Sequence, residues 1–252
     1  MKLKCNLCNE GPIVELPEPQ YFDELILCPD CGRTLASVKK DSFENLVWKV
    51  WDKMKIDVDI PDGKSGEWKI DTFEMNEEDC LLYNSKNEGR ELPPGMYKRL
   101  MCGCETVMTN TPNEINDHLE FINEAKQKGG HVLITGLGLG VCIKAILESE
   151  KITKISVIEL SKDVIKLVAP TYMKDERVEV INCSAFDYEP PENIRYTCVW
   201  HDIWYDICAD NLPQMNKLHR KYENKTDWQG SWVNDLCLEQ TTSDVNYPFY
   251  GN

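Results

Sequence analysis

Short apolar runs recur along this chain, and the pattern that they follow changes near residue 110. Between residues 67 and 109 the runs are brief and extended in character, including the run DCLLYN. Within that stretch, residues 96–110 predict a β-hairpin that turns at Cys102 and Gly103. This part of the chain is therefore predicted to be a small β-rich segment.

Beyond residue 110, apolar runs alternate with helical patterns. A buried strand over 132–135, a helix over 141–148 and a second strand over 155–158 follow one another without long insertions. Strands that alternate with helices are typical of βαβ units and of a parallel sheet. We therefore expect an α/β fold in the C-terminal half of the chain.

The flanking segments predict the remaining elements. A helix begins at Thr111-Pro112, with proline in its first turn, and runs to about residue 128. Another strand covers 196–200, and after it the pattern predicts two helices, over 206–222 and 227–239. Because no strand is predicted after residue 200, we expect a shortened sheet.

A glycine-dense turn joins the strand and the helix of the βαβ unit. Gly136, Gly138 and Gly140 alternate with other residues there, and Glu159 ends the second strand. Glycines let a tight turn bring the backbone close to a ligand, and the following helix begins with free N–H groups. A strand-end carboxylate can accept hydrogen bonds from both ribose hydroxyls. The pattern favours a nucleoside-containing cofactor, and its alternative is a glycine-rich turn that binds nothing.

The spacing distinguishes between nucleoside cofactors. The dinucleotide fingerprint requires glycine or alanine where this chain has Val141, so nicotinamide cofactors are disfavoured. The G-x-G-x-G spacing with a later acid resembles the class I S-adenosylmethionine-dependent methyltransferase fold, which is Rossmann-like. The resemblance implies that S-adenosylmethionine is held by Gly136, Leu137, Gly138, Gly140, Glu159, Leu160, Ser184, Ala185 and Asp202.

Over residues 67–205 the order of motifs is similar to that of the spermidine synthases, an aminopropyltransferase branch of the same fold. The chain departs from that family's pattern at three positions. Asp117 replaces the family's tyrosine, Asn113 replaces its first helix acid, and Ser184 replaces the aspartate that contacts adenine. The matching positions are Glu114, His118, Leu119, Arg177, Val178, Ala185 and Asp202.

Candidate catalytic residues cluster where the strand over 196–200 ends, in the segment VWHDIW. His201 is suited to removing a proton from an acceptor, and Asp202 to holding a cationic amine or taking its proton. Trp200 and Trp204 can stack on a base or a cation. His118 is a third candidate on the preceding helix. For both histidines the alternative is a buried structural role.

Four cysteines near the N-terminus predict a metal site. They form two C-x2-C pairs separated by nineteen residues, which is the spacing of a structural zinc ribbon. Four thiolates leave no open coordination position, so this Zn²⁺ is expected to stabilise structure and to do no chemistry. The predicted ligands are Cys5, Cys8, Cys28 and Cys31.

Composition narrows the choice of partners. The formal charge of −15 disfavours binding along duplex nucleic acid, and no basic cluster offsets it. Twelve cysteines without an export signal indicate reduced thiols. No apolar run is long enough to span a membrane, so a soluble, cytoplasmic protein is expected, and a homo-oligomer is left open.

The chain is expected to divide into four parts. They are a zinc ribbon (1–40), a linker helix (41–62), a β-rich segment and helix (63–128), and the cofactor-binding domain (129–252).

Three functions remain open at this stage. The first is methyl transfer from S-adenosylmethionine to an acceptor that the sequence does not identify. The second is aminopropyl transfer to a polyamine, which suits an acidic chain but not the lost tyrosine. The third is a non-catalytic adaptor that keeps the nucleoside and docks a partner through the zinc ribbon.

Overall fold

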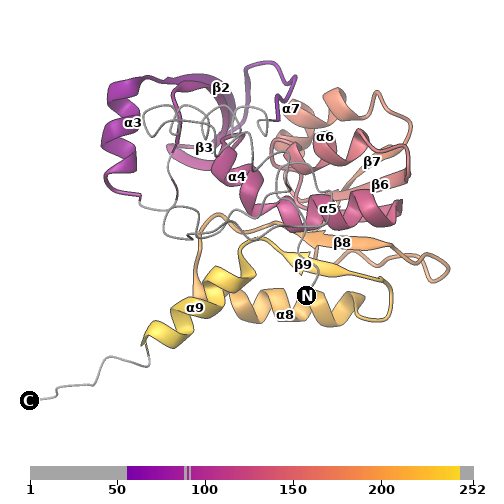
Figure 1. The fold of residues 1–252 in the computed structure, drawn as a ribbon. Helices are drawn as coiled ribbons and strands as arrows, with labels where there is room; N and C mark the ends of the chain where they lie inside the picture. The colour runs from indigo at the N-terminus through magenta and orange to yellow at the C-terminus, as the bar shows by residue number, and fades with distance from the viewer. Residues whose placement is uncertain (1–55, 88–89, 91, 245–252) are drawn as a thin grey trace, which may run out of the picture. The chain divides into compact units, whose positions relative to one another are not determined.

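The computed structural model describes residues 56–87, 90 and 92–244, with side chains through 241. These residues form two β-sheets and the helices that pack against them (Figure 1). One sheet is small and antiparallel, with strand order β1-β2-β3-β4, and the other is parallel, with order β7-β6-β5-β8-β9. The expected α/β fold after a small β-rich segment is confirmed. The predicted zinc ribbon and residues 41–55 of the predicted linker helix lie outside the described residues, and residues 56–62 form no helix.

The antiparallel sheet consists of β1 (Gly63–Ser65), β2 (Trp68–Met75), β3 (Gly95–Cys102) and β4 (Glu105–Thr109). The last two strands form the predicted hairpin, which turns one residue later than expected, at Gly103 and Cys104.

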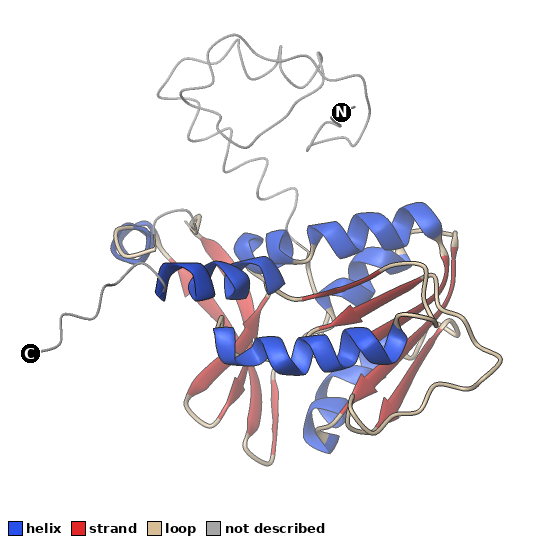
Figure 2. Cartoon of the chain, turned by 90° about the horizontal axis from the view of Figure 1, so that it is seen from below, coloured by secondary structure: helices blue, strands red, loops and turns tan. Residues whose placement is uncertain are grey.

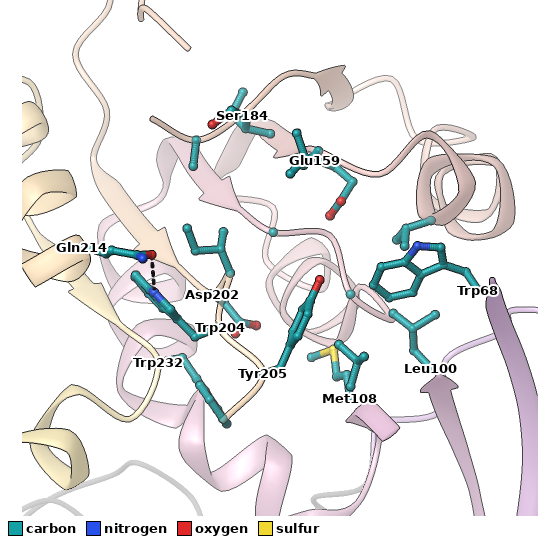
Figure 3. Close-up of a pocket in the computed structure, with 18 of the residues that line it drawn as sticks. Trp68, Leu100, Met108, Glu159, Ser184, Asp202, Trp204, Tyr205, Gln214 and Trp232 are labelled. Carbon is teal, nitrogen blue, oxygen red and sulfur yellow. Dashed lines mark hydrogen bonds between the residues drawn. The ribbon is translucent and has the colours of Figure 1, made fainter. Parts of the chain in front are cut away.

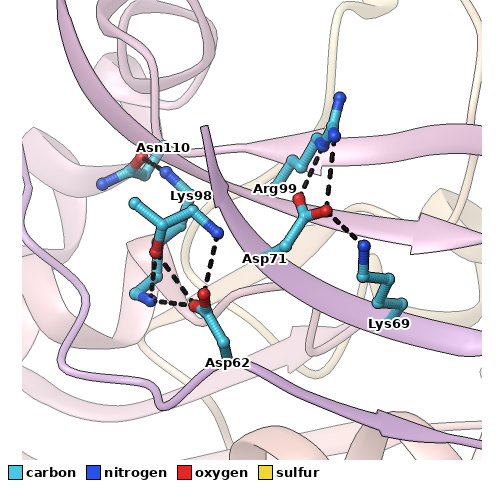
Figure 4. A network of polar contacts seen from close by, with 7 residues as sticks. Asp62, Lys69, Asp71, Lys98, Arg99 and Asn110 are labelled. Atoms are coloured by element: carbon cyan, nitrogen blue, oxygen red, sulfur yellow. Dashed lines mark hydrogen bonds and ion pairs between the residues drawn. The ribbon is translucent and has the colours of Figure 1, made fainter. Parts of the chain in front are cut away.

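Ion pairs lie on both faces of this small sheet. Asp71 lies between Lys69 and Arg99, at 2.6 Å from each, and the Arg99 guanidinium holds the pKa of Asp71 at about 2 (Figure 4). Asp62 accepts hydrogen bonds from Lys98 and Thr72 in the same way. These contacts join neighbouring strands across the sheet.

Two predictions for this region are wrong. The run DCLLYN belongs to α3 (Glu77–Asn84), because Asn76 caps the helix by accepting from the Asp79 N–H at 2.9 Å. Residues 57–66, whose turn-forming residues predict a linker, are instead part of the fold, since Val58 and Ile60 are buried in the core and β1 pairs with β2. Alternating apolar residues outweighed the turn-forming residues around them.

The parallel sheet contains β5 (Gly130–Thr135), β6 (Ile152–Glu159), β7 (Val178–Asn182), β8 (Cys198–His201) and β9 (Gln229–Ser231). Helices α5 (Leu119–Lys128), α6 (Val141–Leu147) and α7 (Lys162–Tyr172) bury apolar residues in one core with Val132 and Trp200. Helix α8 (Leu212–Tyr222) packs on β8 from the opposite face (Figure 2).

The C-terminal region differs most from the sequence prediction. Gln229, Gly230 and Ser231 were predicted as helix but form β9, a fifth parallel strand beside β8. The sequence gives no strand signal there, because only three residues pair and one of them is glycine. The short helix η2 (Ala209–Asn211) precedes α8, and α9 (Asn234–Asp244) follows β9.

The helix predicted from Thr111 to residue 128 is interrupted. It forms α4 (Pro112–Asp117) and α5, which meet at His118. Within the described ranges, no helix is long and apolar enough to cross a membrane.

Candidate active site

A cavity of about 270 Å³ opens at the carboxyl ends of β5, β6 and β8, facing β3 and β4 of the small sheet (Figure 3). We call it the pocket. Ligands of doubly wound sheets bind at this end of the strands. Gly136, Glu159 and Asp202 line the pocket from the large sheet, and Leu100 and Met108 line it from the small one.

The glycine turn forms one wall. Gly136 has φ +96°, and a Cβ there would lie 1.8 Å from the backbone oxygen of Asp202. Gly138 has φ +49°, and its Cβ would lie 2.3 Å from the sulfur of Met108. Both positions therefore require glycine, for conformation and for space.

Most N–H groups of this turn are already engaged. Gly136 donates to the Ile158 carbonyl and Gly140 to the Leu137 carbonyl, both at 2.8 Å. The Leu139 N–H donates to the thioether of Met108 at 3.1 Å. The described residues supply no partner for the N–H of Gly138.

Glu159 fixes the turn against the end of β6. Its Oε2 accepts from the Leu137 N–H at 2.8 Å, and its Oε1 accepts from the Ser161 N–H at 2.7 Å. Burial raises the pKa of this carboxyl, although these two hydrogen bonds oppose the shift. Each carboxylate oxygen has a second lone pair, so Glu159 can still accept from ligand hydroxyls in the pocket.

Asp202 and Glu114 are the acids on the other side of the pocket. Only 17% of the Asp202 side chain and 15% of the Glu114 side chain are exposed. Burial raises the pKa of Asp202 to about 7, although the nearby His118 lowers it. Asp202 can therefore exchange a proton near neutral pH, which suits a general base. His118 itself does not line the pocket; it lies behind both acids.

His201 is placed on the opposite face of the large sheet. Its Nδ1 is 3.0 Å from Thr135 Oγ1, and its ring packs against His219 and Tyr222 of α8. Burial lowers the pKa of His201 to about 3, so the ring is neutral at physiological pH. Neighbouring strand residues face opposite sides, and Trp200 therefore points the other way, stacking on Phe121. The structure does not bring His201 or Trp200 to the pocket.

Aromatic side chains line the rest of the pocket. Trp204 donates to Gln214 Oε1 at 3.1 Å, and Trp232 lies beside it (Figure 3). Tyr205, from the same loop as Trp204, packs edge-on against Trp68 of β2 at 6.4 Å between ring centroids. This contact links the two sheets across the pocket.

The predicted cofactor residues are largely brought together. Leu137 and Gly140 do not line the pocket and act through the turn instead, with Gly140 packed against Tyr172. Asp187, the acid three residues after Ser184, does not line it either. The predicted residues that do line it are Gly136, Gly138, Glu159, Leu160, Ser184, Ala185 and Asp202.

Several lining residues were not predicted. Trp232 is a core residue that also reaches the pocket, and Trp68 and Met108 belong to the small sheet. Their sequence neighbourhoods carry no ligand signal, because only the packing of the two sheets brings them to the pocket. Phe186 follows the predicted Ser184-Ala185 pair directly, so proximity along the chain was the one available signal.

No group of side chains suited to holding a metal ion occurs in the described part of the chain. The four predicted zinc ligands, Cys5, Cys8, Cys28 and Cys31, lie outside it.

No protein-family model matches the chain, and no curated protein matches it either. Solved structures give distant matches. Spermidine synthase from Thermotoga maritima matches with a TM-score of 0.40 at 16% identity, covering 66% of this chain and 53% of that one. The N-methyltransferase NodS from Bradyrhizobium japonicum matches with a TM-score of 0.39 at 9% identity, covering 49% and 71%.

A third match is the 23S rRNA methyltransferase ErmE, with a TM-score of 0.35 at 14% identity, covering 46% of this chain and 47% of that one. The chain thus spans about half the length of ErmE and of the spermidine synthase. These matches are similarities to two methyltransferases and to a spermidine synthase. At TM-scores below 0.5, they assign neither a family nor an activity to the chain.

Proposed function

We propose that the pocket binds S-adenosylmethionine and that the protein transfers its methyl group to an acceptor held beside Asp202. The observation that carries the proposal is that the N–H groups of the glycine turn are mostly hydrogen-bonded within the protein, while Glu159 can still accept hydrogen bonds. A dinucleotide needs free N–H groups for its pyrophosphate. Here the N–H groups of Gly136, Leu137, Leu139 and Gly140 are bonded to protein atoms.

The residues that remain available suit a nucleoside without phosphates. Glu159 offers lone pairs for the two ribose hydroxyls, as an acid at this strand end does in nucleotide-binding folds. Ala185 and Phe186 give apolar surface for a base nearby. Among the described residues that line the pocket, the charged side chains are all acids, namely Glu114, Glu159 and Asp202. A positively charged sulfonium fits such a pocket better than a phosphate does.

The protein itself has two tasks in this reaction, to accept a proton and to orient the acceptor. When bound, S-adenosylmethionine supplies a methyl group from its sulfonium, and the C–S bond breaks as the acceptor's lone pair forms the new bond. Asp202, with a pKa of about 7, takes the proton that the acceptor loses. The aromatic wall of Trp204 and Trp232 orients the acceptor and excludes water.

Aminopropyl transfer is the second candidate, and the acidity of the pocket favours it. S-adenosylmethionine carries an α-carboxylate, for which no lysine, arginine or histidine is provided among the described lining residues. Among the described residues of the glycine turn, the N–H of Gly138 is the one group available to bind that carboxylate. Decarboxylated S-adenosylmethionine lacks the carboxylate and avoids repulsion by Glu114 and Asp202.

Titration calorimetry with four ligands tests the proposal. If the protein transfers methyl groups, the N–H of Gly138 binds the α-carboxylate, so S-adenosylmethionine and S-adenosylhomocysteine should bind more tightly than decarboxylated S-adenosylmethionine, and NAD should not bind. Tighter binding of the decarboxylated compound by tenfold or more would select aminopropyl transfer instead. Binding of NAD alone contradicts both candidates. If S-adenosylmethionine binds but no methyl-acceptor activity is found among amines, nucleosides and proteins, the non-catalytic adaptor becomes the better description.

A further inference from the structure

Behind the floor of the pocket, one fully buried imidazole lies between two carboxylates. The Nε2 atom of His118 is 3.6 Å from Glu114 Oε1 and 3.8 Å from Asp202 Oδ2. The side chain of His118 is 0% exposed, whereas both acids reach the pocket. His118 occupies the break between α4 and α5, so the interruption of the helix is what places its ring there.

The surroundings give this ring no other hydrogen-bond partner. Neither nitrogen of His118 reaches an acceptor or donor at hydrogen-bond geometry within the described ranges. Trp200 packs edge-on against it, with ring centroids 5.8 Å apart, and Cys142 of α6 lies next to it. A neutral imidazole without hydrogen bonds is costly to bury, whereas an imidazolium between two carboxylates is paired electrostatically.

The charged and titratable groups around the His118 ring and around Asp202 come from four places in the fold. Helix α4 supplies Glu114 and Asp117, α6 supplies Cys142, β6 supplies Glu159, and the end of β8 supplies Asp202. Two of the acids already have partners: Arg90 holds Asp117 through two hydrogen bonds of 2.9 and 2.8 Å, and two backbone N–H groups hold Glu159.

Two acids, Glu114 and Asp202, are thus left to face each other, and His118 is the cation between them. The expected charge state of the ring agrees with this geometry. Burial alone would lower the pKa of His118, but the neighbouring carboxylates of Glu114 and Asp202 raise it. The Cys142 thiol stays protonated, because burial raises its own pKa.

We propose that His118 is a positioning residue, an imidazolium that holds Glu114 and Asp202 side by side at the pocket floor. Without that cation, two like charges would repel each other and the acids would separate or take up a proton. With it, the acids keep fixed places and the floor carries a net negative charge. This arrangement belongs to the protein without ligand, and its use in binding a sulfonium rests on the proposed function.

Histidine NMR of the full chain tests the inference without any cofactor. The chain has four histidines, and the other three should be neutral, because burial lowers the pKa of His131, His201 and His219. In protein labelled with ¹⁵N-histidine, we expect a single imidazolium at about pH 7.5. It should disappear in His118→Gln, and its pKa should fall by about one unit or more in Asp202→Asn.

Glu114→Gln gives a second, independent variant should Asp202→Asn or His118→Gln fail to fold. The matched control is Glu120→Gln, which removes an exposed carboxylate two residues from His118 and should leave the imidazolium unchanged. Four neutral rings at about pH 7.5 would overturn the inference. So would an imidazolium that titrates identically in the wild-type protein, Asp202→Asn and Glu114→Gln. Because no ligand is added, failure here is separate from failure of S-adenosylmethionine to bind.

Discussion

Glu159 and Asp202 both line the pocket, but their carboxylates differ in what surrounds them. Glu159 accepts two backbone N–H groups and fixes the glycine turn. The side chain of Asp202 faces His118 and the pocket, and burial places its pKa at about 7. At the scale of single residues, Glu159 is therefore suited to binding and Asp202 to proton transfer.

Replacing Glu159 should weaken ligand binding. Glu159→Gln keeps the length of the side chain but loses charge-assisted hydrogen bonds to the ribose, each of which contributes about 1.5–3 kcal/mol. Its amide nitrogen also cannot accept from one of the two backbone N–H groups that hold the turn. We expect affinity for S-adenosylmethionine to fall on the order of 100-fold, measured by calorimetry. Glu148→Gln, at an exposed carboxylate on the surface, is the control and should bind normally. Equal affinities for both variants would contradict the assignment of Glu159.

Asp202 should make stability depend on pH. Because its pKa of about 7 in the folded protein exceeds the ordinary 3.8, its contribution is fully present below about pH 4 and is lost as the pH rises to about 7. Between about pH 5 and 7, the melting temperature of Asp202→Asn should therefore fall less than that of the wild-type protein. Asp187→Asn, at an exposed position, should follow the wild type. Parallel curves for all three proteins would show that Asp202 is not buried as described.

Among the elements, the glycine turn connects the most parts of the site. Its three glycines approach Asp202 after β8, Met108 of β4 and Tyr172 of α7. The turn thus depends on strands from both sheets, and the cost of a side chain depends on which neighbour it meets. Backbone cannot move aside, whereas the end of a methionine side chain can.

Alanine should have different effects at two of these glycines. Gly138→Ala should lower the free energy of unfolding by about 2 kcal/mol, through its positive φ and its contact with Met108. Met108→Ala should recover part of that loss in the double variant, since the contact is removed. Gly136→Ala meets the Asp202 backbone, so about 4 kcal/mol or more should be lost and Met108→Ala should not help. Urea unfolding of the three single variants and the two double variants measures this, and simple additivity at Gly138 would contradict it.

In the molecule as a whole, the pocket exists because two sheets face each other. Trp68 of β2 meets Tyr205 from the loop after β8, and Met108 of β4 bonds to the glycine turn. Neither sheet has a closed binding site by itself, since lining residues come from both. The small sheet is therefore part of the binding site as well as of the core.

Removing the aromatic ring that the small sheet contributes to the pocket should weaken binding without unfolding the protein. Trp68→Ala takes away a half-buried ring that lines the pocket, and we expect roughly tenfold weaker binding of S-adenosylmethionine by calorimetry. Phe73→Ala, at another ring of the same strand that does not line the pocket, is the control. Equal binding by both variants would mean that the small sheet does not contribute to the ligand site.

The zinc prediction also concerns the whole chain. Elemental analysis of reduced protein should find one zinc per chain, bound by Cys5, Cys8, Cys28 and Cys31. Cys28→Ser should lose it, because three thiolates hold the ion less tightly. Cys104→Ser, at an exposed cysteine in the β3–β4 turn, should retain it. Absence of zinc from both the wild-type protein and Cys104→Ser would contradict the prediction.

The sequence by itself determined the βαβ unit and the positions of its glycines and Glu159. These features are local: period-two and helical apolar patterns, glycine in a tight turn, and an acid at a strand end follow from neighbours along the chain. The β3–β4 hairpin was predictable for the same reason. Where a local signal was weak or misleading, as in α3 and β9, the prediction failed.

Only the tertiary structure decided which candidates meet at the pocket. His201 and Asp202 are adjacent in sequence, yet strand alternation and the chain's turn after β8 send one to α8 and the other to the pocket. Trp68, Met108 and Trp232 join the site from distant segments, and the break at His118 sets a ring between two acids. Contacts between residues far apart in sequence depend on how whole sheets pack, and no local pattern encodes that packing.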